Sequence, residues 1–282
     1  MAKKVSLINM KGGVGKSTLV VNLAWHFAYM NKWRKRVLLV DLDPQFNASQ
    51  YLVGVEKYEK IISNGEPTIW NVFEQHTYTP TKVQPTSLTP KDVIHEVASF
   101  QGRGRIDLVP SQLELAYSLR NPAQKETLLA KFISAIESAY DIILFDCAPT
   151  ESVLTTAAYL ASDYVLVPVK PEYLSTIGLP LLGRSMDEFN KGPYSGHSIE
   201  IAGIVFNHAT DYAPEERKSK RDVRSIAAAN HWYVFESEVS YSRSYPKGAR
   251  EGRPIFWTSY ARYAQAAKFQ AFADELATRI HL

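Results

Sequence analysis

One glycine-rich loop constrains this 282-residue chain more than any other feature. It lies in residues 5–18, which read VSLINMKGGVGKST, so a short apolar run leads directly into the loop. Gly12, Gly13 and Gly15 carry no Cβ, so the backbone can adopt positive φ values and turn successive N–H groups toward a bound anion. Lys16 adds a positive charge for the β- and γ-phosphates of a nucleotide. The sequence therefore predicts a phosphate-binding loop between a strand and a helix.

The residues after Lys16 complete the pattern of a P-loop. Ser17 offers a hydroxyl ligand to Mg²⁺, and the helix expected to begin here directs the positive end of its dipole at the phosphates. A glycine turn without a ligand is the alternative interpretation, but a Gly-Lys-Ser ending directly after a predicted strand favours phosphate binding. The expected nucleotide-binding residues of this loop are Lys11, Gly12, Gly13, Val14, Gly15, Lys16, Ser17 and Thr18.

Two residues at the start of the loop depart from the general P-loop pattern. Met10 stands where that pattern has glycine, and a second lysine, Lys11, follows it. The string KGGVGKST, which ends at Thr18, resembles the deviant Walker A motif of the ParA/MinD ATPases. This resemblance implies that Lys11 reaches across a dimer interface to the nucleotide of the partner subunit. A solvated surface lysine is the simpler interpretation.

A second motif, which contains two acidic residues, lies at the end of the buried strand expected at residues 36–41. It begins DLDPQ and resembles the family's Walker A′ sequence, Asp-x-Asp-Pro-Gln-Gly-Asn, with Phe46 in place of the glycine. Carboxylates at the C-terminal end of a strand lie where open α/β sheets bind ligands. The resemblance implies that Asp43 positions or activates the attacking water and that Asp41 lies near the metal and the phosphates. Phe46 leaves the tightness of this turn open, and two N-cap acids for the next helix are the alternative interpretation.

Residues 140–149, YDIILFDCAP, are a β-rich apolar run that ends in an acid and predict a Walker B strand. Asp146 would hold Mg²⁺ through water on the side opposite Ser17. The residues from Asp146 onward are similar to the family's Asp-x-x-Pro-Pro region, which senses the γ-phosphate. We interpret Cys147 as a small packed side chain and not as a reactive thiol.

Alternation of strands and helices continues along almost the whole chain. It predicts an α/β fold, a P-loop NTPase with a mostly parallel twisted sheet flanked by helices on both faces, in one nucleotide-binding domain of residues 1–282. Residues 54–104 are the least informative stretch, with a loop expected at 77–90. Other expected strands lie at 4–9, 105–110, 164–169 and 199–207. Expected helices lie at 19–30, 67–73, 125–139 and about 258–280, and a further helix is expected after the strand at 164–169, ending at about residue 190.

The last expected strand ends at Asn207. The resemblance places an adenine-contacting Asn or Asp near this position, and an amide can both donate to and accept from a base. A turn or capping role is the alternative interpretation of Asn207.

Composition limits the class of protein further. The single cysteine, Cys147, excludes a disulfide framework and a paired-cysteine metal site. No signal-peptide-like segment and no apolar run near 18 residues occurs, so we expect a cytoplasmic protein. The resemblance to the ParA/MinD ATPases implies that it is nucleoid-associated. The net charge of +3 does not by itself indicate nucleic acid as a partner.

Positive charge is concentrated in two segments of the C-terminal third. Residues 217–224 carry five positive charges against one negative, and residues 243–253 carry four against one. The second segment resembles the family stretch that ends in Gly-Lys-Pro-Ile and flanks its DNA-binding surface, whereas solvated helical faces are the simpler interpretation of both. The candidate DNA contacts are Arg217, Lys218, Lys220, Arg221, Arg224, Arg243, Lys247, Arg250 and Arg253.

The resemblance covers nearly the whole chain, with its three nucleotide motifs in the expected order. It implies a ParA-like partition ATPase that forms a homodimer on binding ATP and Mg²⁺, binds DNA non-specifically and hydrolyses ATP when a ParB-type partner stimulates it. In that interpretation Lys11, Lys16 and Mg²⁺ offset the charge on the transferred phosphoryl group while Asp43 orients water.

Four other functions use the same kind of P-loop. A related ATPase could position a protein assembly instead of DNA. A MinD-type membrane switch needs a basic amphipathic tail after the last core helix, and only His-Leu follows Ile280. An electron-transfer iron protein needs more bridging cysteines than Cys147 supplies. A small-molecule ligase would place a substrate pocket where this chain has its basic segments.

Overall fold

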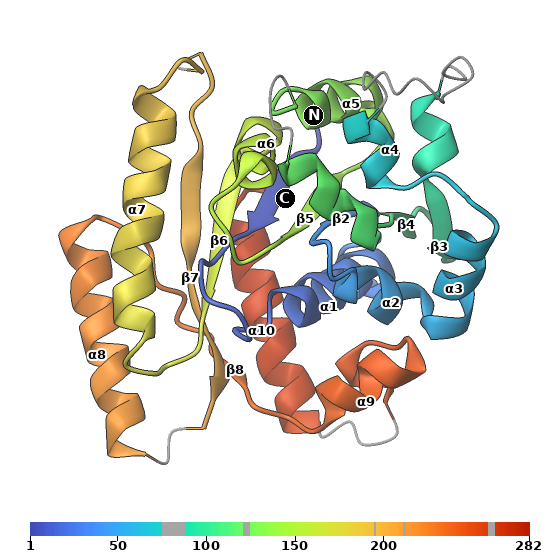
Figure 1. Ribbon diagram of the computed structural model, residues 1–282. Helices are drawn as coiled ribbons and strands as arrows, with labels where there is room; N and C mark the ends of the chain where they lie inside the picture. The colour runs from blue at the N-terminus through green and yellow to red at the C-terminus, as the bar shows by residue number, and fades with distance from the viewer. Residues whose placement is uncertain (75–87, 121–124, 195, 211–212, 259–262) are drawn as a thin grey trace.

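The computed structural model describes residues 1–74, 88–120, 125–194, 196–210, 213–258 and 263–282. Within these residues, eight strands form one sheet in the order β3-β4-β2-β5-β1-β6-β7-β8 (Figure 1). Neighbouring strands are parallel except β3 and β4, which are antiparallel. The strands are β1 (Lys3–Leu7), β2 (Arg36–Leu42), β3 (His95–Ser99), β4 (Arg105–Val109), β5 (Ile142–Cys147), β6 (Tyr164–Val169), β7 (Glu200–Ala209) and β8 (Val239–Ser240).

Helices cover both faces of this sheet (Figure 1). One apolar core lies between the sheet and α1, α2, α9 and α10, and a second lies between the sheet and α4 to α8. The described α-helices are α1 (Lys16–Tyr29), α2 (Asn47–Val53), α3 (Val55–Ser63), α4 (Ile69–Glu74), α5 (Leu128–Ile136), α6 (Val153–Ala161), α7 (Ser175–Lys191), α8 (Pro214–Ala229), α9 (Ser244–Glu251) and α10 (Tyr263–Arg279).

The central strands are apolar on both sides because both faces are covered. In β2, Val37 and Leu39 belong to the core beneath α1, whereas Leu38 and Val40 belong to the opposite core. Such uninterrupted apolar runs are typical of parallel strands buried between two helical layers. The structure confirms the predicted fold class.

Residues 54–104 differ most from what the sequence indicates. They contain α3 and the antiparallel strand β3, neither of which the sequence analysis expects. The residues of β3 are half-buried or exposed, so this edge strand lacks the apolar run that marks the central strands. Residues 77–87 of the expected loop lie outside the described residues. The expected helix at 125–139 is shorter, because α5 ends at Ile136 and a 3-10 turn (Glu137–Ala139) follows it.

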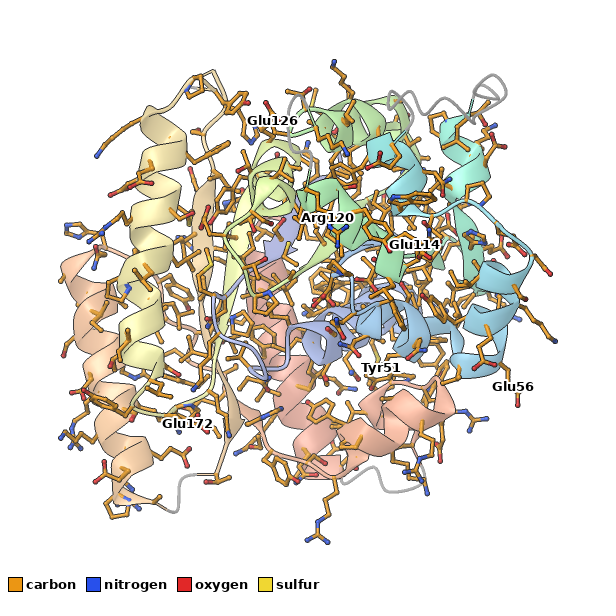
Figure 2. All side chains as sticks on the ribbon, in the orientation of Figure 1. Tyr51, Glu56, Glu114, Arg120, Glu126 and Glu172 are labelled. Atoms are coloured by element: carbon orange, nitrogen blue, oxygen red, sulfur yellow. The ribbon has the colours of Figure 1, made fainter. Side chains whose placement is uncertain are left out.

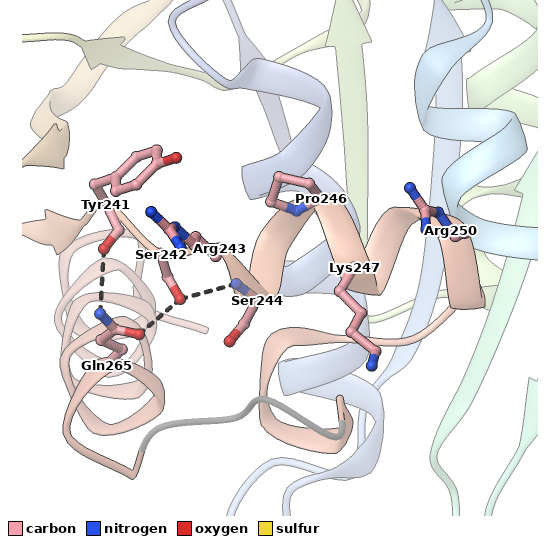
Figure 3. A pocket seen from close by; sticks show the side chains of 8 residues that line it. All are labelled: Tyr241, Ser242, Arg243, Ser244, Pro246, Lys247, Arg250 and Gln265. Atoms are coloured by element: carbon pink, nitrogen blue, oxygen red, sulfur yellow. Dashed lines mark hydrogen bonds between the residues drawn. The ribbon is translucent and has the colours of Figure 1, made fainter.

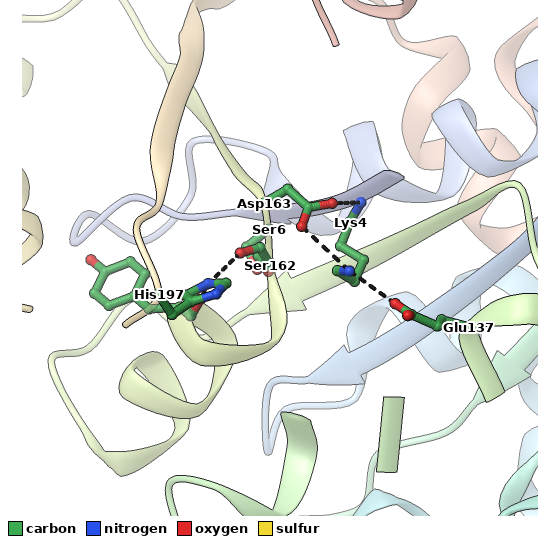
Figure 4. Close-up of polar contacts among 7 residues, drawn as sticks. Lys4, Ser6, Glu137, Ser162, Asp163 and His197 are labelled. Carbon is green, nitrogen blue, oxygen red and sulfur yellow. Dashed lines mark hydrogen bonds and ion pairs between the residues drawn. The ribbon is translucent and has the colours of Figure 1, made fainter. Parts of the chain in front are cut away.

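A polar network fixes β1 against its neighbours near the N-terminal ends of the strands (Figure 4). The ammonium group of Lys4 lies 2.9 Å from Glu137 Oε2 and 3.3 Å from Asp163 Oδ1. The backbone N–H of Lys4 also donates to Asp163 Oδ2 at 3.0 Å. Because these contacts join β1 to the segments before β5 and β6, they hold the strand that carries the P-loop at its other end.

Candidate functional site

The three predicted nucleotide motifs converge because their strands are neighbours in the sheet. The order β2-β5-β1 places the C-terminal ends of these strands side by side. Asp41 on β2 is in register with Asp146 on β5, and Asp146 is in register with Leu7 on β1, just before the P-loop. A cavity of about 490 Å³ opens over this edge. Its lining includes Gly12, Gly13, Gly15, Lys16, Ser17, Thr18, Asp43, Tyr51 and Pro149.

The backbone of the P-loop adopts the conformation that its glycines allow. Gly13 and Gly15 have φ values of 73° and 88°, whereas Gly12 is not in the positive-φ region. Gly15 precedes α1, and a Cβ at this position would lie only 2.3 Å from Asn207 Nδ2. Glycine is therefore required at position 15 both for its backbone angle and for the space beside Asn207.

Lys16 lies inside the loop and not in solvent. Its ammonium group donates to the carbonyl of Asn9 at 3.2 Å and to that of Lys11 at 3.5 Å, and the residue is 7% exposed. Burial lowers the pKa of Lys16, while the nearby carboxylate of Asp146 acts in the opposite direction. The lysine is thus held where phosphate oxygens would replace or share its carbonyl partners.

Asp41 organises the turn of the second motif. Its Oδ2 accepts hydrogen bonds from the backbone N–H and the hydroxyl of Ser49, at 2.8 and 2.7 Å, and its Oδ1 accepts from the N–H of Asp43 at 3.0 Å. Complete burial raises the pKa of Asp41 to about 7. Asp43 lines the cavity, and the N–H of Gln45 donates to its Oδ1 at 2.9 Å. These contacts orient the Asp43 carboxylate.

The turn remains tight although Phe46 replaces the family's glycine. Phe46 is in the left-handed region, with φ 46° and ψ 26°, immediately before α2. Its N–H donates to the carbonyl of Asp43 at 2.8 Å. The structure thereby answers the question that the sequence leaves open at this position.

Asp146 has the environment of a metal-binding carboxylate. It is completely buried, and neither of its side-chain oxygens has a hydrogen-bond partner of standard geometry. Burial raises the pKa of Asp146 well above its usual value, and the charge of Asp41 adds to this, while Ser17 and Lys16 oppose it. Buried polar atoms are nearly always satisfied, so these oxygens fit a ligand that is a hard cation.

The donor set fits Mg²⁺ shared with a nucleotide better than a metal held by protein alone. No group of three or more His, Cys, Asp and Glu side chains suited to a metal occurs among the described residues. Mg²⁺ commonly uses one or two protein oxygens together with phosphates and water. Ser17 and Asp146, with Asp41 beside them, would supply these oxygens.

Asn207 lies beside the P-loop but does not line its cavity. Its Nδ2 donates to the carbonyl of Val14 at 2.7 Å, and its Oδ1 accepts from the N–H of His208 at 3.0 Å. The residue is 1% exposed, so its amide fastens the end of β7 to the loop. The adenine contact of Asn207 stays a prediction.

Lys11 has a partner that the sequence analysis does not identify. Its ammonium group lies 2.8 Å from Glu172 Oε2, and Lys170 contacts the other oxygen of the same carboxylate. Figure 2 shows Glu172 where the chain enters α7. The two residues are 161 positions apart, so only the fold brings them together. No local pattern in the sequence assigns a role to Glu172.

The first basic segment, residues 217–224, lies in the middle of α8, and its members differ in environment. Arg217, Lys218 and Arg221 are exposed. Lys220 instead points inward, where its ammonium group lies 2.6 Å from Glu238 and 3.4 Å from Glu216. The structure therefore does not support Lys220 as a DNA contact, because its ammonium group is paired within the fold. Arg224 is intermediate, packing over the ring of Phe206 at 5.3 Å with Glu238 Oε1 3.8 Å away.

The second basic segment lines a large cavity beside α9 (Figure 3). This cavity of about 1010 Å³ is bordered by three cationic side chains, Arg243, Lys247 and Arg250, together with Tyr241 and Gln265. Arg253 is exposed at the end of the same segment. Hydrogen bonds from Gln265 to Tyr241 O at 3.2 Å and from Ser242 to Gln265 at 2.6 Å fix the chain that leads into α9.

The fold and the converging motifs define a P-loop nucleoside triphosphatase, and comparison with known proteins narrows this class. A family model described as an AAA domain matches residues 2–200. The chromosome-partitioning ATPase Soj of Thermus thermophilus is 32% identical over 276 residues, which are 98% of this chain and 87% of Soj. The chain therefore belongs to this AAA-domain family, as a ParA/MinD-type ATPase.

Solved structures agree with this assignment at the level of the fold. Apo McdA from Cyanothece has a TM-score of 0.79 at 16% identity, covering 98% of this chain and 100% of McdA. A plasmid partition protein from Borrelia burgdorferi bound to AMPPNP has a TM-score of 0.74 at 20% identity, with 99% of both chains covered. No described helix is long and apolar enough to cross a membrane.

Proposed function

We propose that this ATPase is a partition protein. It works as one nucleotide-binding domain that dimerises when it binds ATP and Mg²⁺, binds DNA non-specifically as a dimer, and releases DNA after hydrolysis stimulated by a ParB-type partner. The observation that supports nucleotide binding most directly is Asp146, which is buried beneath the P-loop and whose two carboxylate oxygens have no hydrogen-bond partner of standard geometry. The names of the Thermus and Borrelia proteins support the proposed role in partition.

Each residue of the site has a distinct task in hydrolysis. Loop N–H groups and Lys16 bind the phosphates, and Asp146 and Ser17 would hold Mg²⁺, which neutralises phosphate charge when bound. Asp43, oriented by Gln45, positions the attacking water. Lys11 of the partner subunit would supply a further positive charge to the phosphates. Because each of these groups acts through its position and its charge, hydrolysis needs no covalent intermediate with the protein.

The exposed cations give the dimer a DNA-binding surface. Arg217, Lys218 and Arg221 on α8 and Arg243 and Arg250 at α9 are exposed. Side chains of this type bind phosphates without reading the bases, so the affinity would depend on salt and not on sequence. Two subunits present twice the number of charges, and the ATP-dependent dimer therefore binds more tightly than the monomer.

Substitution of the two P-loop lysines tests this function. Lys16→Ala should abolish nucleotide binding, because its charge is inside the loop of the same subunit. Lys11→Ala should keep nucleotide binding by the monomer but lose the ATP-dependent dimer. Calorimetry measures the first property, and sedimentation with Mg²⁺ and AMPPNP measures the second. Lys32→Ala, on a side chain that is 64% exposed, is a matched control.

Equal loss of nucleotide affinity in Lys11→Ala and Lys16→Ala would contradict the proposal, since Lys11 would then act in its own subunit.

A further inference from the structure

Glu172 connects the P-loop to the start of α7 through Lys11. The Lys11 ammonium group and Glu172 Oε2 are 2.8 Å apart, and their side chains are 24% and 41% exposed. The backbone on both sides is fixed. The N–H of Lys11 donates to Asn9 Oδ1 at 2.9 Å, and the carbonyl of Glu172 accepts from the N–H of Ser175 at 2.9 Å.

We infer that Glu172 is a positioning residue that holds Lys11 in its own subunit and so opposes formation of the ATP-dependent dimer. This inference rests on the proposed function, in which Lys11 serves the nucleotide of a partner. A lysine that is bound to Glu172 at 2.8 Å cannot at the same time extend to a phosphate of another subunit. Dimer formation must therefore break this ion pair in each subunit.

The ion pair between Lys11 and Glu172 can break without leaving an unpaired charge. Lys170 contacts the second oxygen, Oε1, of Glu172. When Lys11 leaves, Glu172 therefore keeps one cationic partner and is not left as an unpaired charge. Lys11 in turn exchanges one carboxylate for a nucleotide phosphate group that carries more negative charge. Partial exposure to water lowers the barrier to this exchange further.

The size of the effect follows from the exposure of the pair and from symmetry. Exposed ion pairs change an equilibrium constant by about 1.5- to 5-fold each. A dimer breaks two of them, so the factors multiply. Glu172→Gln should therefore tighten the dimer by roughly 2- to 25-fold.

The experiment measures the dimer dissociation constant of Glu172→Gln by sedimentation with saturating Mg²⁺ and AMPPNP, which is not hydrolysed. The affinity of the monomer for ADP should be unchanged, since Glu172 does not line the P-loop cavity. Glu172→Asp should lie between Glu172→Gln and wild type, because its shorter side chain keeps the charge at a greater distance. Glu188→Gln is the matched control, an exposed acid on α7, the helix that follows Glu172.

A second pair of variants separates this inference from the proposed function. In a Lys11→Ala background, Glu172→Gln should restore no dimer, because the released residue is missing. If Lys11→Ala alone forms the dimer normally, the proposed function fails. If Lys11→Ala loses the dimer but Glu172→Gln leaves the dissociation constant unchanged or raises it, only this inference is overturned. Restoration of the dimer by Glu172→Gln in the Lys11→Ala background would also overturn it, since Glu172 would then act by repelling the partner.

Discussion

The ring of Phe46 stacks on the ring of Tyr58, with centroids 5.0 Å apart and planes inclined by 15°. The hydroxyl of Tyr58 donates to the carbonyl of Ser111 at 3.0 Å, so the stack also connects the turn to the residues after β4. A left-handed residue other than glycine costs about 1–2 kcal/mol. Aromatic pairs contribute about 0.5–1.5 kcal/mol beyond their buried area. Contact with Tyr58 thus offsets the strain at Phe46 and keeps the turn beside Asp43 closed.

This balance predicts an unusual order of stability at position 46. Phe46→Ala and Phe46→Gly both lose the stack, but only alanine keeps the strain of φ 46°. Phe46→Gly should therefore be more stable than Phe46→Ala by about 1 kcal/mol. Urea unfolding of the two variants measures the difference. Equal stability, or alanine as the more stable, would mean that the turn is not left-handed in solution.

Asp43→Ala should separate nucleotide binding from hydrolysis. The phosphate contacts come from the P-loop, so the variant should still bind Mg-ATP and dimerise, whereas water near the γ-phosphate is no longer oriented. We expect turnover to fall by about 100-fold or more and the dimer to accumulate. Phosphate release and sedimentation with ATP measure the two effects. Wild-type turnover would remove the water-positioning role of Asp43.

Asp146→Asn should stabilise the empty protein while removing its response to Mg²⁺. An amide takes the place of a buried carboxylate without the cost of burying a charge, so the free energy of unfolding should rise by roughly 0.5–2 kcal/mol in the absence of ligand. The further stabilisation by Mg-ATP in the wild type should be lost. Thermal unfolding with and without Mg²⁺ and AMPPNP measures both.

Asp41→Asn is the control for this prediction. Its carboxylate accepts hydrogen bonds from Ser49 and Asp43, so the amide cannot replace it and the empty protein should become less stable. Destabilisation by Asp146→Asn to the same degree would show that Asp146 is also satisfied within the fold.

DNA affinity should fall steeply with salt. If two to four cations per subunit contact phosphates, the dimer neutralises about four to eight charges, and log affinity against log salt has a slope of about −4 to −7. Arg243→Glu should lower the affinity and flatten the slope without changing ATP binding. Lys220→Ala should lower stability instead and leave the slope unchanged, because Lys220 pairs with Glu238. DNA affinity that does not depend on ATP would contradict the proposed surface.

The nucleotide motifs can be predicted from the sequence because each is local. Each motif can be recognised from adjacent residues alone, as a glycine-rich loop after an apolar run or as an acid at the end of an apolar run. The strand order β2-β5-β1 then brings Asp41, Asp146 and Lys16 together. Contacts between distant segments carry no such signal. The direction of Lys220 depends on Glu238, and the partner of Lys11 is 161 residues away. The sequence does not predict the edge strand β3, because its half-buried and exposed residues follow no apolar pattern.

The internal hydrogen bonds of Lys16 have a consequence for the rate at which nucleotide arrives. The ammonium group already occupies the centre of its loop, held by the carbonyls of Asn9 and Lys11. The loop thus has its binding shape before any phosphate enters, and little conformational freedom remains to be lost at that step. In the proposed cycle, we therefore expect nucleotide capture by a single subunit to be limited by diffusional encounter. We expect the slow steps to fall later, where one subunit would meet another.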